Sequence, residues 1–160
     1  MKRVVFIGQA PARPTSKHGV AGTYLRPWLY ELGLDEQTIV RHCRFYALID
    51  SFPGSDTHGH LRPTPEQIVR YRPLLLNLIK EFMPDIIVPV GAMAIKEVLP
   101  NVAGGLRNTI GHTYYVDLFG GFGKEILVIP LPHPSGRSVW INTNRDKVAK
   151  ALLLLKDNIT

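Results

Sequence analysis

The stretch Pro84-Asp85-Ile86-Ile87-Val88-Pro89-Val90-Gly91-Ala92-Met93-Ala94 decides the fold. Ile86 to Val90 is a short, continuous apolar run, which is typical of a strand that is buried on both faces. Gly91 then leads directly into a helix that we expect over residues 92–99. A buried strand followed at once by a helix is the unit from which parallel sheets covered by helices are built.

The same alternation extends in both directions along the chain. Strands are expected over residues 3–7, 45–49, 86–90, 114–118 and 125–131. Helices are expected over residues 23–32, 65–83, 92–99 and 144–157, with Thr23 and Thr64 as N-terminal caps and Pro27 in a first turn. This pattern predicts a three-layer α/β/α fold with a four- to five-stranded, mainly parallel sheet, in a single domain spanning residues 1–160.

Composition sets the class of protein. The 160 residues are 45% hydrophobic and 20% charged, which are ordinary values for a soluble globular domain. Lys and Arg number 19 against 13 Asp and Glu, and the formal net charge of +6 favours a polyanionic partner. The single cysteine, Cys43, excludes an internal disulfide and a four-cysteine metal site. The N-terminal apolar run is too short for a signal peptide or membrane span, so we expect a cytoplasmic protein. We also expect it to be a monomer.

Three polar or Pro-rich segments follow predicted strands. They are Gly8-Gln9-Ala10-Pro11-Ala12, Asp50-Ser51-Phe52-Pro53 and Pro132-His133-Pro134-Ser135-Gly136. Ligands of open parallel sheets bind outside the carboxyl ends of the strands, so these segments are predicted to share one rim.

Several kinds of chemistry are disfavoured. No Gly-rich phosphate loop follows a strand, so no nucleotide cofactor is expected. Asp56, His58 and His60 alternate on an extended segment, but a metal site needs further ligands, and a solvated loop explains them better. Ser135 lies close to His133, yet no Gly-x-Ser-x-Gly turn accompanies it, which argues against serine hydrolysis. We expect neither a metal nor a cofactor.

His133 lies between Pro132 and Pro134, which restrict the neighbouring backbone. An imidazole held in this way can stabilise negative charge that develops on a leaving group. The alternative is a tight turn that contains a hydrogen-bonded histidine, and the residue alone does not decide between the two interpretations.

Two segments resemble the signature motifs of the uracil-DNA glycosylase superfamily: Gly8-Gln9-Ala10-Pro11-Ala12 and His133-Pro134-Ser135-Gly136-Arg137-Ser138. Residues 63–68, 71–75 and 84–94 are similar to the iron–sulfur branch of that superfamily, its families four and five. Residues 106–111 also match a segment that precedes the last strands. The resemblance covers nearly the whole chain.

The resemblance implies an enzyme of base-excision repair that flips a damaged or deaminated base, uracil or a related one, into a pocket and hydrolyses its N-glycosidic bond. His133 would hydrogen-bond the departing base, and Gln9 would help to place a water. The pocket would be lined by Gly8, Ala10, Pro11, Tyr24 and Ala47, with Tyr24 stacking on the base.

The partner that the resemblance implies is single- or double-stranded DNA. Ser135, Gly136, Arg137 and Ser138 would form a tip that enters the duplex. Candidate phosphate contacts are Arg13, Lys17, Arg137 and Arg145.

The chain also departs from the family pattern. The most active uracil glycosylases carry an acid where this chain has Ala10, and the iron–sulfur branch has Glu at the position of Gln9. The cluster cysteines are absent: Tyr71 stands at one such position and Ser51 at another, while Ala47 replaces a base-reading Asn. Asp50 is the nearest replacement acid and a candidate catalytic group.

These departures from the family pattern leave two other functions open. The first is a glycosylase-fold module that binds nucleic acid or nucleotides without catalysis. The second is a different enzyme that acts on modified bases or nucleotides, because one fold hosts many reactions.

Overall fold

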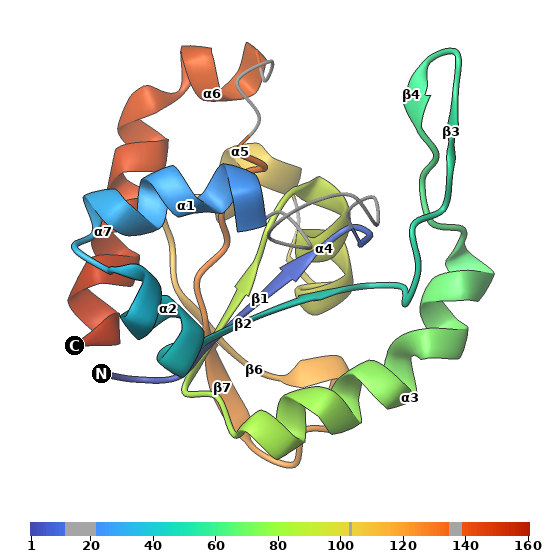
Figure 1. Cartoon of the computed structure of the whole chain (residues 1–160), viewed down its shortest axis with the longest axis horizontal. Helices are drawn as coiled ribbons and strands as arrows, with labels where there is room; N and C mark the ends of the chain where they lie inside the picture. Colours follow the sequence, from blue (N-terminus) through green and yellow to red (C-terminus); the bar gives the residue numbers. More distant parts are fainter. Residues whose placement is uncertain (12–21, 103, 135–138) are drawn as a thin grey trace.

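The computed structural model describes residues 1–11, 22–102, 104–134 and 139–160. Five strands form one sheet in the order β2-β1-β5-β7-β6, with helices on both sides (Figure 1). The strands are β1 (Val4–Gly8), β2 (Cys43–Ala47), β5 (Ile86–Pro89), β6 (Tyr114–Asp117) and β7 (Glu125–Val128). Within this sheet only β6 is antiparallel to its neighbour. The predicted α/β/α fold with a mainly parallel sheet is confirmed.

β1 is an inner strand of the sheet and is buried along its whole length. It pairs in parallel with β2 on one side and with β5 on the other. Its side chains alternate between the two faces, so both faces need a covering layer. Phe6 stacks on Phe45 of β2, with ring centroids 5.1 Å apart, and this contact joins the two strands through their side chains.

Seven helices belong to the described part of the chain. They are α1 (Gly22–Glu31), α2 (Glu36–His42), α3 (Pro65–Phe82), α4 (Ala92–Val98), α5 (Gly105–Thr109), α6 (Val139–Thr143) and α7 (Arg145–Ile159). Figure 1 shows α3 on the opposite side of the sheet from α1 and α7. Arg72 of α3 pairs with Glu97 of α4 at 2.6 Å, which ties these two helices together. A search of the described residues found no helix that is long and apolar enough to cross a membrane.

Helix α3 begins at a capping box, as its sequence predicts. The Thr64 hydroxyl accepts a hydrogen bond from the Gln67 backbone N–H at 3.2 Å, and the Gln67 side chain accepts one from the Thr64 N–H at 2.8 Å. Pro65 occupies the first helical position, where no N–H is needed. The reciprocal bonds satisfy two backbone donors that would otherwise lack partners at the helix start.

Three local predictions are wrong in detail. The second strand covers Cys43–Ala47 rather than residues 45–49, although Leu48 and Ile49 stay buried beyond its end. Helix α1 begins at Gly22, so Thr23 is not its cap and Pro27 lies in the second turn. The last strand ends at Val128 rather than at Leu131, although Leu131 still forms a bridge with Val90.

Three short helices and one short hairpin were not predicted from the sequence. Helix α2 begins after Asp35, whose carboxylate accepts a hydrogen bond from the Thr38 N–H. Helices α5 and α6 have five residues each, too few for a periodic pattern. The predicted polar loop contains a hairpin of β3 (Ser55–Asp56) and β4 (Gly59–His60), which extends away from the sheet in Figure 1.

We expect Thr64→Ala to lower the free energy of unfolding by about 1 kcal/mol, because it removes a side-chain cap. This corresponds to a fall in Tm of about 2–4 °C for a domain of this size. Thermal unfolding followed by circular dichroism measures the effect. Thr113→Ala, at an exposed loop position, is the matched control and should leave Tm unchanged. Equal Tm values for the two variants would argue against a stabilising capping box.

Candidate functional site

The carboxyl ends of β1, β2, β5 and β7 meet at one edge of the sheet. Gly8 at the end of β1 pairs with Ala47 at the end of β2. Beyond the ends of β5 and β7, Val90 and Leu131 form a parallel bridge, and the Gly91 N–H donates to the Leu131 carbonyl at 2.9 Å. The described parts of the segments that begin at Gly8, Asp50 and Pro132 therefore lie at one edge of the sheet, as predicted, and the turn at Gly91 lies there too.

Gly91 brings the start of α4 close to His133. Its φ of +88° favours glycine, and a β-carbon built on it would lie 3.6 Å from the His133 Cβ. Gly91 and His133 are therefore close neighbours. His133 follows Leu131 by two residues, and backbone bonds join Leu131 to Pro89 and Gly91.

Tyr24, which was predicted to stack on the base, lies beside His133. The two ring centroids are 5.9 Å apart with a tilt of 55°, and Tyr24 is 55% exposed. The aromatic surface of Tyr24 therefore remains largely open next to the imidazole. His133 is exposed by surface area, but the protein around the imidazole partly desolvates it and lowers its pKa below the usual value, which favours the neutral ring at pH 7.

The first motif contributes mostly backbone to this edge. Gln9, Ala10 and Pro11 are partly buried, and the Gly8 carbonyl accepts a hydrogen bond from the Leu48 N–H at 3.1 Å. Ala47, predicted to line the pocket, is only 4% exposed and presents a methyl group. A methyl group cannot distinguish bases by hydrogen bonding, so Ala47 contributes only shape.

Asp50 follows the end of β2 and is exposed. It lines a cavity of about 260 Å³ whose wall also includes Tyr71 of α3. Burial raises the pKa of Tyr71, and the nearby Asp50 carboxylate raises it further, so the phenol is protonated at neutral pH. Asp50 therefore lies beside α3 at the end of β2, whereas His133 follows β7, which is three strands away in the sheet order.

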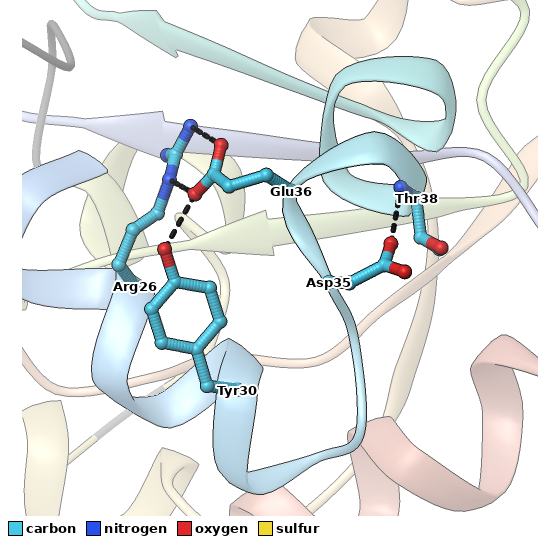
Figure 2. Close-up of polar contacts among 5 residues, drawn as sticks. All are labelled: Arg26, Tyr30, Asp35, Glu36 and Thr38. Atoms are coloured by element: carbon cyan, nitrogen blue, oxygen red, sulfur yellow. Dashed lines mark hydrogen bonds and ion pairs between the residues drawn. The ribbon is translucent and has the colours of Figure 1, made fainter.

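Helix α1, which carries Tyr24, is held to α2 by a buried arginine (Figure 2). Arg26 is 11% exposed and pairs with Glu36 through Nε at 2.8 Å. The Tyr30 hydroxyl donates to the same carboxylate at 2.6 Å, and this bond raises the Tyr30 pKa. The Arg26 guanidinium also lies 5.0 Å from the ring centroid of Phe45 in β2. These contacts position the helix that presents Tyr24.

Arg145 is exposed at the start of α7, where a phosphate contact was predicted. Lys147, two residues further on, donates to the Arg107 carbonyl of α5 at 3.0 Å, so this end of α7 lies against α5 and carries several basic residues. Arg13, Lys17 and the tip residues Ser135, Gly136, Arg137 and Ser138 lie outside the described residues.

No metal-binding group of three His, Cys, Asp or Glu occurs among the residues that the structure describes. Asp56 instead accepts a hydrogen bond from the His58 backbone N–H at 2.8 Å and caps the hairpin turn. Cys43 is buried, and burial raises its pKa to about 11, so its thiol is protonated and inert.

Sequence reasoning missed the Arg26–Glu36 pair and the residues of α3 that line the Asp50 cavity. The two charges of the pair are ten positions apart on different helices, and no local pattern joins them. The Asp35 cap was the one available signal, because an Asp before Glu36 indicates a helix start.

The family model for the uracil DNA glycosylase superfamily matches residues 1–156, and the chain belongs to that superfamily. A comparison with curated proteins gave no significant match.

We expect Glu36→Ala to lower the free energy of unfolding by about 1–3 kcal/mol, because it leaves the buried Arg26 without its carboxylate. Thermal unfolding measures the loss. Glu31→Ala on the exposed side of α1 is the matched control and should change Tm little. If both variants unfold at the same temperature, Arg26 does not depend on Glu36.

The lowered pKa of His133 predicts a pH dependence of stability. The folded protein resists protonation of this imidazole more than the unfolded chain does, so stability falls as the pH drops below the unfolded value of about 6.5. The fall in Tm between pH 7.5 and 5.5 should therefore be larger for the wild type than for His133→Asn. Equal falls would mean that partial desolvation of His133 has no energetic consequence.

Proposed function

We propose that this protein is a monofunctional DNA glycosylase that removes a damaged or deaminated base during base-excision repair. The observation that carries the proposal is the placement of His133 at the carboxyl edge, close to Gly91 and beside the largely exposed ring of Tyr24. This arrangement offers a flipped base one aromatic surface and one imidazole. Superfamily membership supports the same chemistry.

In the proposed reaction the bond between C1′ and the base nitrogen breaks as an oxocarbenium-like sugar forms. The neutral His133 imidazole donates a hydrogen bond to the base as negative charge develops on it. Water then adds its oxygen to C1′, and the departing base gains a proton overall. The net reaction is hydrolysis, and it needs no cofactor.

Gln9 is the proposed water-positioning residue. Its amide can orient a water molecule but cannot accept a proton at neutral pH. The proposal assigns no proton transfer to Asp50, because its carboxylate lines the cavity on the α3 side of β2. Catalysis on this account depends mainly on stabilising the leaving base.

The proposed substrate range follows from the side chains that Ala10 and Ala47 do not provide. Ala10 provides no acid, and Ala47 provides no amide to read the base. The pocket therefore selects by shape and stacking, and it favours bases that leave readily as anions. Uracil, hypoxanthine and hydroxymethyluracil in oligonucleotides are the substrates to compare.

The proposed partner is DNA, bound by a single copy of the chain in the cytoplasm or nucleoid. Arg145 and the basic residues near it supply phosphate contacts on one side. Arg13, Lys17 and the tip at Ser135, Gly136, Arg137 and Ser138 supply the others. Such contacts lose affinity steeply as the salt concentration rises.

A second candidate is a nucleic-acid-binding module with little or no catalysis. The absence of a carboxylate at both Gln9 and Ala10 favours it. Base release from lesion-containing oligonucleotides distinguishes the two, because a binding module would retain affinity without product.

The test of the proposal is His133→Ala. Single-turnover excision should slow by a factor of about a hundred or more, as when one preorganised hydrogen-bond donor is removed. Substrate affinity should change far less, since phosphate contacts dominate it. Arg137→Ala is the contrasting variant: it should impair duplex substrates and spare single-stranded ones, in which no base pair must be opened. A full excision rate in His133→Ala would refute the proposed mechanism.

A further inference from the structure

The cavity at the end of β2 has no part in the mechanism proposed above. It encloses about 260 Å³ between the segment after β2 and the first half of α3. Its polar lining residues are Asp50, Ser51, Gln67, Arg70 and Tyr71, and its apolar ones are Ile49 and Leu74. A volume of this size has room for one nucleobase.

Two opposite charges in this cavity have unused hydrogen-bonding capacity. Asp50 and Arg70 are both exposed. Within the described part of the chain, neither side chain makes a hydrogen bond or an ion pair. The cavity thus presents a carboxylate with two acceptor oxygens and a guanidinium with a fork of donors.

We propose that this cavity binds an unpaired guanine base, with Asp50 on its Watson–Crick edge and Arg70 on its O6 and N7 atoms. Guanine is the one DNA base with two adjacent N–H donors on its Watson–Crick edge, N1–H and N2–H, which match the two oxygens of a carboxylate. Its other edge carries the two acceptors that arginine contacts bidentately. Leu74 and Ile49 supply apolar surface for the ring.

The other bases fit this pair of charges less well. Uracil and thymine place carbonyl oxygens on both sides of N3–H, and a carboxylate repels those oxygens. Adenine has an acceptor at N1, next to its single amino group. Cytosine offers one amino group and acceptors beside it. The cavity therefore selects against uracil and is distinct from the proposed pocket beside His133.

The guanine can come from two sources, the substrate strand or a free guanine nucleotide. The ends of β2 and β7 are three strand spacings apart, which is about 14 Å at the usual separation. An extended single strand can cross that distance within a few nucleotides, so a guanine near the excised base can reach the cavity. This first source rests on the proposed function, whereas the second does not.

Binding of lesion-free, fluorescently labelled pentamers tests the proposal by anisotropy. The sequence TTGTT should bind about tenfold more tightly than TTATT or TTTTT, since one good bidentate contact discriminates by about this factor. Inosine lacks the N2 amino group and 7-deazaguanine lacks N7. Each replacement should remove much of the preference.

Two variants assign the contacts. Asp50→Asn should remove the distinction between guanine and inosine, and Arg70→Gln should remove the distinction between guanine and 7-deazaguanine. Arg41→Gln, which removes an exposed arginine of α2, is the matched control for loss of positive charge. It should weaken all pentamers equally and preserve the preference for guanine.

Competition by dGMP, against dAMP and TMP, completes the test. If dGMP binds selectively while no pentamer does, the guanine site stands and its ligand is a free nucleotide rather than the substrate strand. If guanine is preferred but no lesion is excised, the site stands and the glycosylase proposal fails. Equal binding of all pentamers together with equal binding of the three nucleotides overturns the guanine site.

Discussion

The parallel register of β1, β5 and β7 is the constraint on which the candidate site depends. The backbone bonds from Val90 to Ile7 and from Gly91 to Leu131 align the ends of these strands at one edge. A shift of β7 by one residue would turn its side chains to the opposite faces and move His133 away from Gly91. The buried apolar residues of these strands make such a shift costly, because one continuous core depends on their pairing.

The site combines a rigid edge with a helix that is positioned from elsewhere. His133 follows Leu131, which backbone bonds join to Pro89 and Gly91, while Tyr24 depends on the anchoring of α1 by Arg26. The Arg26 guanidinium lies over the ring of Phe45 in β2, and this ring stacks on Phe6 in β1. The sheet therefore positions the His133 ring directly, and it positions the Tyr24 ring through the largely buried guanidinium of Arg26. A neutral imidazole follows from its partial desolvation, and it suits stabilisation of a leaving anion.

The sequence predicted elements whose signals are local. Apolar runs marked the strands, and the Thr64–Gln67 capping box marked the start of α3. Helices α5 and α6 were missed because five residues show no period. The parallel sheet then predicted which segments meet at the rim, because the topology rule needs only strand ends.

Contacts between distant side chains were beyond the sequence. Asp50 and Arg70 are far apart in the chain, and only the packing of α3 beside β2 puts them in one cavity. Ser51 and Tyr71, which line this cavity, stand where the iron–sulfur branch of the superfamily has cluster cysteines. In this chain the cavity is therefore lined mainly by polar side chains rather than by cysteines. His133 after β7 and the cavity after β2 are thus two separate features of the same sheet edge.

The most direct test is the protonation and hydrogen bonding of the His133 imidazole when a base is bound. NMR of ¹⁵N-histidine-labelled protein, bound to an oligonucleotide with the uncleavable analogue 2′-fluoro-2′-deoxyuridine, reports the protonation and hydrogen bonding of the imidazole. The account predicts a neutral ring with one N–H shifted downfield by a strong hydrogen bond to the base, and loss of that signal in His133→Asn. A His133 spectrum that is unchanged by saturating DNA would contradict it.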